Sequence, residues 1–484
     1  MGCKSFWQLD STEHFGWLLC YTFSALISAY MLGIYGPAFL SIAELAADES
    51  GNLAFLGIKW TNVITLPASV GSMCMLFVGP FFGSLADYTS YRKVFGAIAM
   101  VGTILCVFTN IFVSTDTIGI ILVATSIQAV TYLCVYSMYR AAYLPELAKT
   151  EAEVTQLSAK GYLILFVSQL CFMGTLIAAA NSFGGADPVA YMRTAAIIVV
   201  VVGSLIAVVV ITKMGYRPAV SKLEDGENIF TIGFISIYKS FREMATDYTQ
   251  LCRFMCFTSF ANSSFNAAPA LAVTYMSALN LSINQITLVL GLTLVVGIGG
   301  PILVTVLKKK FDLAINKIMM VVICLYMVFM ISFPFLAMLG YGLIIFGGMG
   351  IGLASGMWLA SGQAFFASLC PGGKEATFTG CYMFANKVLD WSPPLVFSVV
   401  NQSTNNLILS YYCATLIFVL ASVILCYTID MEKGKKEIKD TLKDRRLSVI
   451  QNDDETKLDV KVQETAQPLD AVAKPVESPE ESDL

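Results

Sequence analysis

The chain alternates twelve apolar stretches, each about 20 residues long, with polar connections. The hydrocarbon core of a bilayer is about 30 Å thick and an α-helix rises about 1.5 Å per residue, so each stretch is long enough to cross it. Because lipid offers the backbone no hydrogen bonds, such a segment has to be a helix. The sequence therefore predicts an all-α membrane protein with twelve transmembrane helices.

The composition excludes a soluble protein. Hydrophobic residues make up 56% of the chain and charged residues 13%, about half the usual share in soluble domains. The thirteen cysteines are scattered singly, without the paired spacing of zinc or redox sites, so we interpret them as packing residues. No catalytic nucleophile, metal cluster or nucleotide loop is evident in the pattern. We predict no enzyme activity, no cofactor or metal, and no nucleic-acid partner.

The predicted spans are 17–40, 61–86, 94–113, 117–143, 157–182, 190–212, 251–276, 284–306, 315–338, 341–366, 378–400 and 405–429. Lys and Arg gather in alternate connections, which the positive-inside rule assigns to the cytoplasm, together with both termini. Two glycosylation triplets, at Asn280 and Asn401, fall in the other connections, where an acceptor has to lie.

A polar segment near the middle divides the chain into two groups of six spans. The predicted parts are a cytoplasmic N-terminal segment (1–16), a six-helix bundle (17–213), a cytoplasmic linker (214–250), a second six-helix bundle (251–429) and a cytoplasmic tail (430–484). Within the tail, a basic helix beside the membrane is expected near 433–443. The rest is rich in Pro, Glu, Ser and Asp, which predicts disorder.

The end of the second span carries a motif, G-S-L-A-D-Y-T-S-Y-R-K at 83–93. It resembles the signature of the major facilitator superfamily, roughly G-x-L-A-D-x-x-x-x-R-K, in the same place between spans two and three. In this interpretation Gly83 lets neighbouring helices approach and Asp87 lies at a helix end. Arg92 and Lys93 form a charged turn. Such a cluster can latch the two halves together on the cytoplasmic side, and the resemblance implies the major facilitator fold.

Further segments resemble the autophagy-related vacuolar amino-acid effluxer family. Residues 139–147 (Y-R-A-A-Y-L-P-E-L) and 157–162 (L-S-A-K-G-Y) are similar to its Y-N-x-Y-L-P-E-L and S-S-K-G-x segments. Residues 361–382 are similar to its S-x-x-x-F-x-x-L-x-P-x-G-x-E-A-x-F-F-G-x-Y stretch, and Lys387 falls where the family carries a lysine. The resemblance implies a secondary carrier that releases amino acids from a vacuole.

The chain departs from that family at two places inside the membrane. The family's Y-D-W-A-N in the first span is Y-T-F-S-A at 21–25 here, and its Y-N-D-G in span seven is A-N-S-S at 261–264. Two intramembrane carboxylates are therefore missing, which leaves substrate choice and proton coupling open. The alternatives are a transport-inactive regulator or trafficking partner, and a carrier of another solute such as a sugar or an organic cation.

Lys387 and Asp390 are the only oppositely charged pair inside a predicted span. A bare ion in the bilayer centre is costly, and residues three apart on one helix share a face, so the two are expected to bind each other. Pro393 and Pro394 are expected to bend or interrupt the helix just beyond them. Two interpretations stay open. The pair either satisfies itself and fixes span eleven, or an amino acid or a proton competes for it, with Lys387 facing a carboxylate and Asp390 facing an ammonium or titrating.

Polar and aromatic residues inside the spans are weaker candidates for a solute cavity between the halves. Besides Lys387 and Asp390, the candidate substrate-binding residues are Asn262, Asn266, Tyr132, Tyr136, Tyr139 and Trp358. As a group they predict a partly polar cavity suited to a small zwitterion. The glycine-rich run at 347–352 lies in an apolar span, which predicts close helix contact rather than a phosphate site.

The resulting prediction is a secondary-active transporter of amino acids or similar small polar solutes that works by alternating access, with proton coupling through Asp390 as one version. It is expected in the vacuolar, lysosomal or plasma membrane, with the solute and the lipid bilayer as its partners. In the tail, R-R-L-S at 445–448 resembles a kinase site, and the final S-D-L at 482–484 resembles a ligand of a PDZ-type groove.

Overall fold

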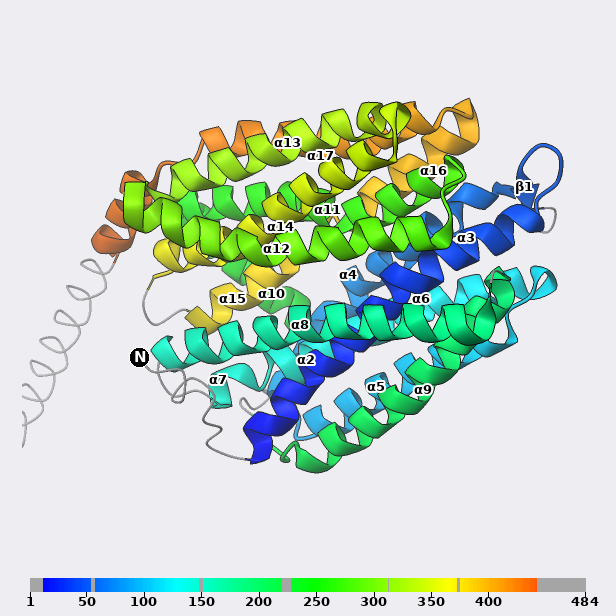
Figure 1. Ribbon diagram of the computed structural model, residues 1–484. Helices are drawn as coiled ribbons and strands as arrows, with labels where there is room; N and C mark the ends of the chain where they lie inside the picture. The colour runs from blue at the N-terminus through cyan, green and yellow to red at the C-terminus, as the bar shows by residue number, and fades with distance from the viewer. Residues whose placement is uncertain are drawn as a thin grey trace, which may run out of the picture.

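The computed structural model describes residues 12–53, 57–147, 151–185, 187–219, 228–311, 313–371 and 375–441. Within this part of the chain, two bundles of membrane-crossing helices lie side by side (Figure 1). The first bundle contains α2 (Thr12–Tyr30), the π-helix η1 (Met31–Tyr35), α3 (Gly36–Leu45), α4 (Thr65–Tyr88), α5 (Arg92–Thr109), α6 (Ile118–Val135), the π-helix η5 (Tyr136–Ala141), α8 (Glu151–Gly184) and α9 (Pro188–Lys213). Short helices η2 (Trp60–Asn62), η3 (Asn110–Phe112), η4 (Thr115–Thr117) and α7 (Leu144–Leu147) lie in its connections.

The second bundle follows a separate helix, α10 (Ile229–Asp247). It contains α11 (Thr249–Ala278), α12 (Ile283–Phe311), α13 (Ile315–Leu339), α14 (Tyr341–Leu369), α15 (Glu375–Ala385), α16 (Ser392–Thr404) and α17 (Leu407–Tyr427). A small antiparallel hairpin, β1 (Asn52–Leu53) with β2 (Ile58–Lys59), is the one departure from helical structure among the labelled elements. The predicted all-α membrane fold is confirmed, with this hairpin as a small element in a connection.

Ten helices within the described ranges are long and apolar enough to cross a membrane. The other two crossings are α11, whose polar residues lower its hydropathy, and the interrupted pair α15 and α16. Most predicted spans end within a few residues of the observed helices, but α8 begins six residues earlier than the predicted span at 157. Spans one and four contain π-helical turns instead of being α-helical throughout.

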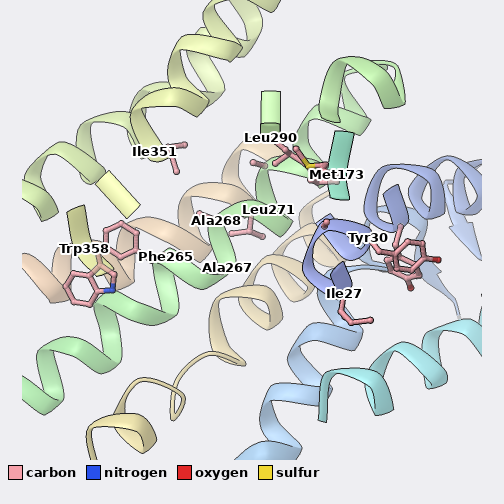
Figure 2. Close-up of a cluster of buried hydrophobic side chains, with 14 of the residues drawn as sticks. Ile27, Tyr30, Met173, Phe265, Ala267, Ala268, Leu271, Leu290, Ile351 and Trp358 are labelled. Carbon is pink, nitrogen blue, oxygen red and sulfur yellow. The ribbon is translucent and has the colours of Figure 1, made fainter. Parts of the chain in front are cut away.

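The hydrophobic core runs through both bundles without a break. Figure 2 shows Met173 of α8 beside Leu290 of α12, where the two bundles meet. Nearby, the Thr287 hydroxyl of α12 donates to the carbonyl oxygen of Gly33 in η1 at 2.8 Å. A side chain on Gly33 would collide with Met173, so glycine is required for this approach.

Helices α12 and α14 pack at their glycines. A Cβ added to Gly352 or Gly356 of α14 would strike a backbone oxygen of α12. Without side chains at these positions the two backbones come into direct contact, as in small-residue interfaces of membrane helices. The close helix contact predicted for the glycine-rich run is confirmed.

Helix α10 lies inside the segment that the sequence assigned to a linker. It packs along α4, where a Cβ on Gly233 would collide with the carbonyl oxygen of Pro80. Phe230 stacks on Phe81 with ring centroids 4.8 Å apart. The tail begins with a helix at 431–441, which agrees with the helix predicted near 433–443. Glu437 accepts a hydrogen bond from the backbone of Gln250 at 3.0 Å, which holds this helix against α11.

The outer ends of the first helix and of residues 431–441 lie on the same side of the bundles, which we call the terminal side (Figure 1). The β1–β2 hairpin lies at the other end, which we call the hairpin side. Which of the two faces the cytoplasm stays a prediction. Residues 445–448 and 482–484, with the kinase and PDZ-type patterns, lie outside the described ranges.

On the hairpin side the two bundles are joined by a polar cluster, the hairpin-side clasp. Its members are Lys59, Thr61, Asn62 and Thr65 of the first bundle, and Ser398, Asn401, Gln402 and Asn405 of the second. The Asn401 amide donates to Thr61 at 2.6 Å and to Asn62 at 3.0 Å. Lys59 donates to the Asn401 carbonyl and to Asn405, both at 2.7 Å. The hairpin side is therefore closed.

The clasp corrects one expectation from the sequence. Asn401 is only 1% exposed and its amide is engaged across the interface, so it is not accessible as a glycosylation acceptor in this conformation. Asn280, the other predicted acceptor, is exposed. The triplet pattern carries no information on burial, which explains the difference.

Candidate solute-binding site

Span eleven is broken at the predicted charged pair. Helix α15 ends at Ala385, residues 386–391 form turns, and α16 begins at Ser392. A bend or an interruption was expected just beyond the pair; the helix is interrupted, but the break contains the pair instead of following it. Pro393 and Pro394 lie in the first turn of α16, where the missing N–H groups cost nothing, so the prolines start a new helix instead of bending an old one.

The broken segment nevertheless brings the charged pair together. The Lys387 ammonium donates to Oδ2 of Asp390 at 2.8 Å. The Lys387 side chain is 40% exposed, whereas that of Asp390 is 7% exposed. The second carboxylate oxygen, Oδ1, is buried and has no hydrogen-bond partner among the described residues. The pair is thus only half satisfied, with one buried acceptor left over.

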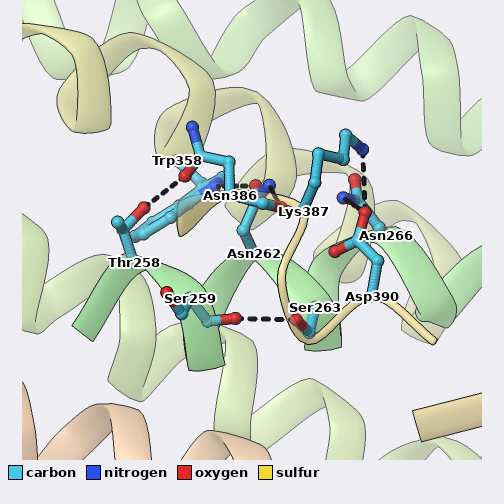
Figure 3. Close-up of polar contacts among 9 residues, drawn as sticks. All are labelled: Thr258, Ser259, Asn262, Ser263, Asn266, Trp358, Asn386, Lys387 and Asp390. Atoms are coloured by element: carbon cyan, nitrogen blue, oxygen red, sulfur yellow. Dashed lines mark hydrogen bonds and ion pairs between the residues drawn. The ribbon is translucent and has the colours of Figure 1, made fainter. Parts of the chain in front are cut away.

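One face of α11 supports the break. The residues on this face are Thr258, Asn262 and Asn266, at four-residue spacing. Figure 3 shows their contacts with the broken segment. Thr258 donates to the Asn386 side chain at 2.6 Å, Asn262 donates to the Asn386 carbonyl at 2.8 Å, and Asn266 donates to Oδ2 of Asp390 at 2.9 Å. Helix α11 therefore bonds one backbone carbonyl and two side chains of the broken segment.

Trp358 of α14 completes this group from the other side. Its indole N–H donates to Oδ1 of Asn262 at 3.1 Å, and its ring stacks on Phe265 at 5.2 Å. We call the set Thr258, Asn262, Asn266, Trp358, Asn386, Lys387 and Asp390 the break cluster. Five of the predicted substrate-binding residues lie in it, and all come from the second bundle.

The three predicted tyrosines lie elsewhere, in the first bundle. Tyr132 shares a hydrogen bond with Ser28 of α2 at 3.0 Å. Tyr136 faces the Arg140 guanidinium at 4.7 Å. Tyr139 is fully buried, and its hydroxyl donates to the carbonyl of Lys93 at 2.7 Å, so it packs η5 against α5. The structure does not bring these residues together with the break cluster.

Asn386 and Thr258 were missed by reasoning from the sequence. The signal for Thr258 was present, since it lies four residues before Asn262 on a helix with unusually many hydroxyl and amide side chains. Asn386 directly precedes Lys387, but nothing local marks it as the residue at which the helix breaks. Arg140 lies inside predicted span four, and no role was predicted for it.

The predicted gating motif lies at the terminal side of α4 and α5. Arg92 is 1% exposed and donates to the carbonyl of Ala142 at 3.3 Å, while Lys93 lies over the Tyr216 ring at 4.5 Å. Asp87 is in the last turn of α4, and its side chain is outside the described set. The role expected of Gly83 is wrong here, because a Cβ added to it would meet nothing within 4 Å.

An apolar cavity of about 130 Å³ lies between α8 and the helices α11, α12 and α14. Thr293 and Ser355 are the hydroxyl-bearing residues of its lining, which otherwise consists of apolar side chains and glycines. It contains none of the predicted site residues. The described residues offer no group of three or more His, Cys, Asp or Glu side chains arranged to hold a metal ion.

Comparison with known proteins agrees with this architecture. The family model described as "Vacuole effluxer Atg22 like" matches residues 12–439. Autophagy-related protein 22 of Saccharomyces cerevisiae is 24% identical over 258 residues, which cover 51% of this chain and 46% of the yeast protein. The chain thus spans about half the length of this curated relative. The uncharacterized MFS-type transporter YxiO of Bacillus subtilis is 21% identical over 416 residues, or 83% of this chain and 91% of YxiO.

Two solved structures have the same fold at low sequence identity. The nucleoside transporter NupG is 13% identical, with a TM-score of 0.61 and coverage of 86% of this chain and 98% of NupG. The xylose transporter XylE from E. coli is 14% identical, with a TM-score of 0.57 and coverage of 86% and 100%. This chain is a multi-pass membrane protein with the major facilitator fold, and it belongs to the family described as "Vacuole effluxer Atg22 like".

Proposed function

We propose that the protein moves amino acids or similar small zwitterions by alternating access, with the break cluster as its binding site. The observation that carries this proposal is the unpartnered, buried Oδ1 of Asp390 beside a partly exposed Lys387. A buried carboxylate oxygen without a donor is costly, and an ammonium group or a proton would satisfy it. A break in a membrane-spanning helix is where transporters commonly place such a site.

The two carboxylate oxygens of Asp390 are bonded unequally, and this difference determines what the carboxylate can bind. Oδ2 accepts from both Lys387 and Asn266, while Oδ1 is left over. An ammonium or a proton that binds Oδ1 reduces the negative charge that holds Lys387. The lysine then releases the carboxylate and faces the solute. In this scheme solute and proton compete at one carboxylate, which links transport to pH.

The closed hairpin side in this conformation supports one half of an alternating-access cycle. The hairpin-side clasp closes one end, so a solute would reach the break cluster from the terminal side. The resemblance to the vacuolar effluxers supports amino acids as cargo and the vacuolar or lysosomal membrane as the location. The positive-inside pattern supports a cytoplasmic terminal side.

The test uses the full chain in liposomes, a labelled amino-acid panel and two imposed pH gradients. Asp390→Asn and Lys387→Met are expected to lower transport and to remove its pH dependence. Ser403→Ala, which changes only a hydroxyl bonded within its own helix, serves as the matched control. Unchanged affinity and unchanged pH dependence in the two charge variants would remove the proposed site. Absence of flux for every amino acid would favour a transport-inactive regulator, and flux of a sugar or an organic cation alone would change the cargo.

A further inference from the structure

Arg140 is a buried cation without a counter-charge. It is 5% exposed, no carboxylate among the described residues pairs with it, and its Nε has no hydrogen-bond partner. Its guanidinium is instead surrounded by tyrosine rings. The distances from Cζ to the ring centroids are 3.9 Å for Tyr21, 4.7 Å for Tyr136 and 5.8 Å for Tyr162. We call these four residues the arginine cage.

The rings satisfy this cation only in part. The face of an aromatic ring attracts positive charge, and the Tyr21 side chain also shares a hydrogen bond with Arg140, but Nε is left without an acceptor. Those donors form a flat fork that matches the two oxygens of a carboxylate. A buried charge left without such an acceptor is unfavourable, so the cage is incomplete as described.

Several elements hold the cage in place. Arg140 lies in η5, a π-helical turn, and such turns are frequent at functional sites. The Trp17 indole of α2 donates to the Arg140 carbonyl at 3.2 Å, which fixes the backbone. Gly161 of α8 leaves room for Tyr21, because a Cβ there would lie 2.5 Å from the tyrosine Cζ. Three helices thus converge on one guanidinium.

In the break cluster, Lys387 is already engaged by Asp390 at 2.8 Å. Among the described residues no carboxylate pairs with Arg140, so of these two cations it is the one left without an anion in this conformation.

We propose that the arginine cage binds the carboxylate of the transported solute. This inference rests on the proposed transport of small zwitterions and names the first-bundle contact for their anionic end. The ammonium end is left to compete with Lys387 for Asp390. The two groups are not brought together in this conformation, so a zwitterion that binds both would have to draw the bundles closer, which gives a reason for them to close around it.

The competing interpretation is a purely structural cage that ties α2, η5 and α8 together. The two differ in the unliganded protein. If Arg140 is a structural tie, Arg140→Gln lowers the unfolding temperature without ligand. If Arg140 awaits a carboxylate, removing an unpaired buried charge leaves that temperature equal or higher.

The experiment measures binding to the full chain in detergent, by calorimetry and by thermal unfolding. The probes are the twenty amino acids, the amide of each, acetate and chloride. The variants are Arg140→Gln and Arg140→Lys. The control is Arg193→Gln, which removes an arginine of α9 that donates to the carbonyl of Val113 at 2.6 Å, outside the cage.

We expect at least one amino acid to bind the native protein and its amide to bind about tenfold more weakly or worse. Arg140→Gln should bind the amino acid more weakly by about the same factor, and its affinity for the amide should be unchanged. Arg140→Lys, which keeps the charge but not the fork, should fall between them. The control should bind as the native protein does.

The inference is overturned if Arg140→Gln binds the amino acid as tightly as the native protein, or if no carboxylate, acetate included, binds the native protein. Chloride binding as tightly as acetate through Arg140 would replace the carboxylate site with a simple anion site. The proposed function fails separately. If a carboxylate binds and Arg140 is needed for it, but no solute crosses the liposome membrane, only the proposed transport is refuted. If Asp390→Asn abolishes flux while Arg140→Gln transports with an unchanged KM, only the role of the arginine cage is refuted.

Discussion

Asn401 joins the two bundles through the hairpin-side clasp, and its removal gives a quantitative test of how this side closes. The Asn401 amide makes two hydrogen bonds across the interface, to Thr61 and Asn62. Each such bond contributes about 1 kcal/mol net, so Asn401→Ala should destabilise the closed hairpin side by about 2 kcal/mol. That energy changes the ratio of closed to open molecules by about 30-fold.

Opening of the hairpin side can be measured by cysteine labelling at a position next to the clasp. Ser69 of α4 is 3% exposed and lies one helical turn from Thr65, which bonds Ser398 across the interface at 2.7 Å. Ser69→Cys should react slowly with a membrane-impermeant maleimide while the clasp is closed. Adding Asn401→Ala should raise the labelling rate by up to about 30-fold, after subtraction of labelling in the chain without Ser69→Cys.

The matched control for this test is Ser403→Ala on the same helix. The Ser403 hydroxyl bonds only the carbonyl of Val400 and makes no contact with the first bundle, so labelling should stay at the native rate. If Asn401→Ala also labels at the native rate, or if Ser403→Ala opens the hairpin side equally, the clasp does not hold the bundles together.

Three further predictions concern packing, the break cluster and an ion pair. Gly356→Ala puts a Cβ against a backbone oxygen of α12 and should destabilise by about 1–3 kcal/mol in thermal unfolding, whereas Gly342→Ala, with open space around it, should not. Trp358→Phe keeps the aromatic stack but loses the indole N–H, so the KM of uptake should rise about 2- to 10-fold, and an unchanged KM would exclude the indole from the site. Glu13→Gln breaks a partly exposed 2.7 Å ion pair with Arg217 and should cost less than about 1 kcal/mol in denaturant, and a larger loss would show that solvent screening was overestimated.

The fold was largely predictable because it depends on local hydropathy. Spans of about 20 apolar residues have to be helices in lipid, and the count of twelve then leads to two groups of six. Even α11 was found, although its many polar side chains keep it outside the apolar set of ten. The same polar residues, Thr258, Asn262 and Asn266, turn out to support the break in span eleven.

The details of the candidate site depend on contacts between distant segments, which the sequence does not reveal. The proline pair predicted an irregularity in span eleven, but its position at 386–391 depends on hydrogen bonds from α11. The burial of Asn401 depends on how the end of α16 in the second bundle meets Thr61 of the first. Likewise, Arg140 is enclosed by tyrosines from three separate helices, and only the neighbouring Tyr136 is local in sequence.

The interruption of span eleven also has a mechanical consequence. Helix α16 is tied to α4 by the clasp, whereas α15 packs beside α10 and α11 near the opposite face. Six residues without a continuous helical ladder separate them, and this joint is where Lys387 and Asp390 lie. The angle between α15 and α16 can therefore change at this joint more easily than within a continuous helix. Because Lys387 and Asp390 lie in this joint, a change in their charge on solute binding acts directly where α15 and α16 meet. The coupling between binding and conformational change then needs no chain of intermediate residues.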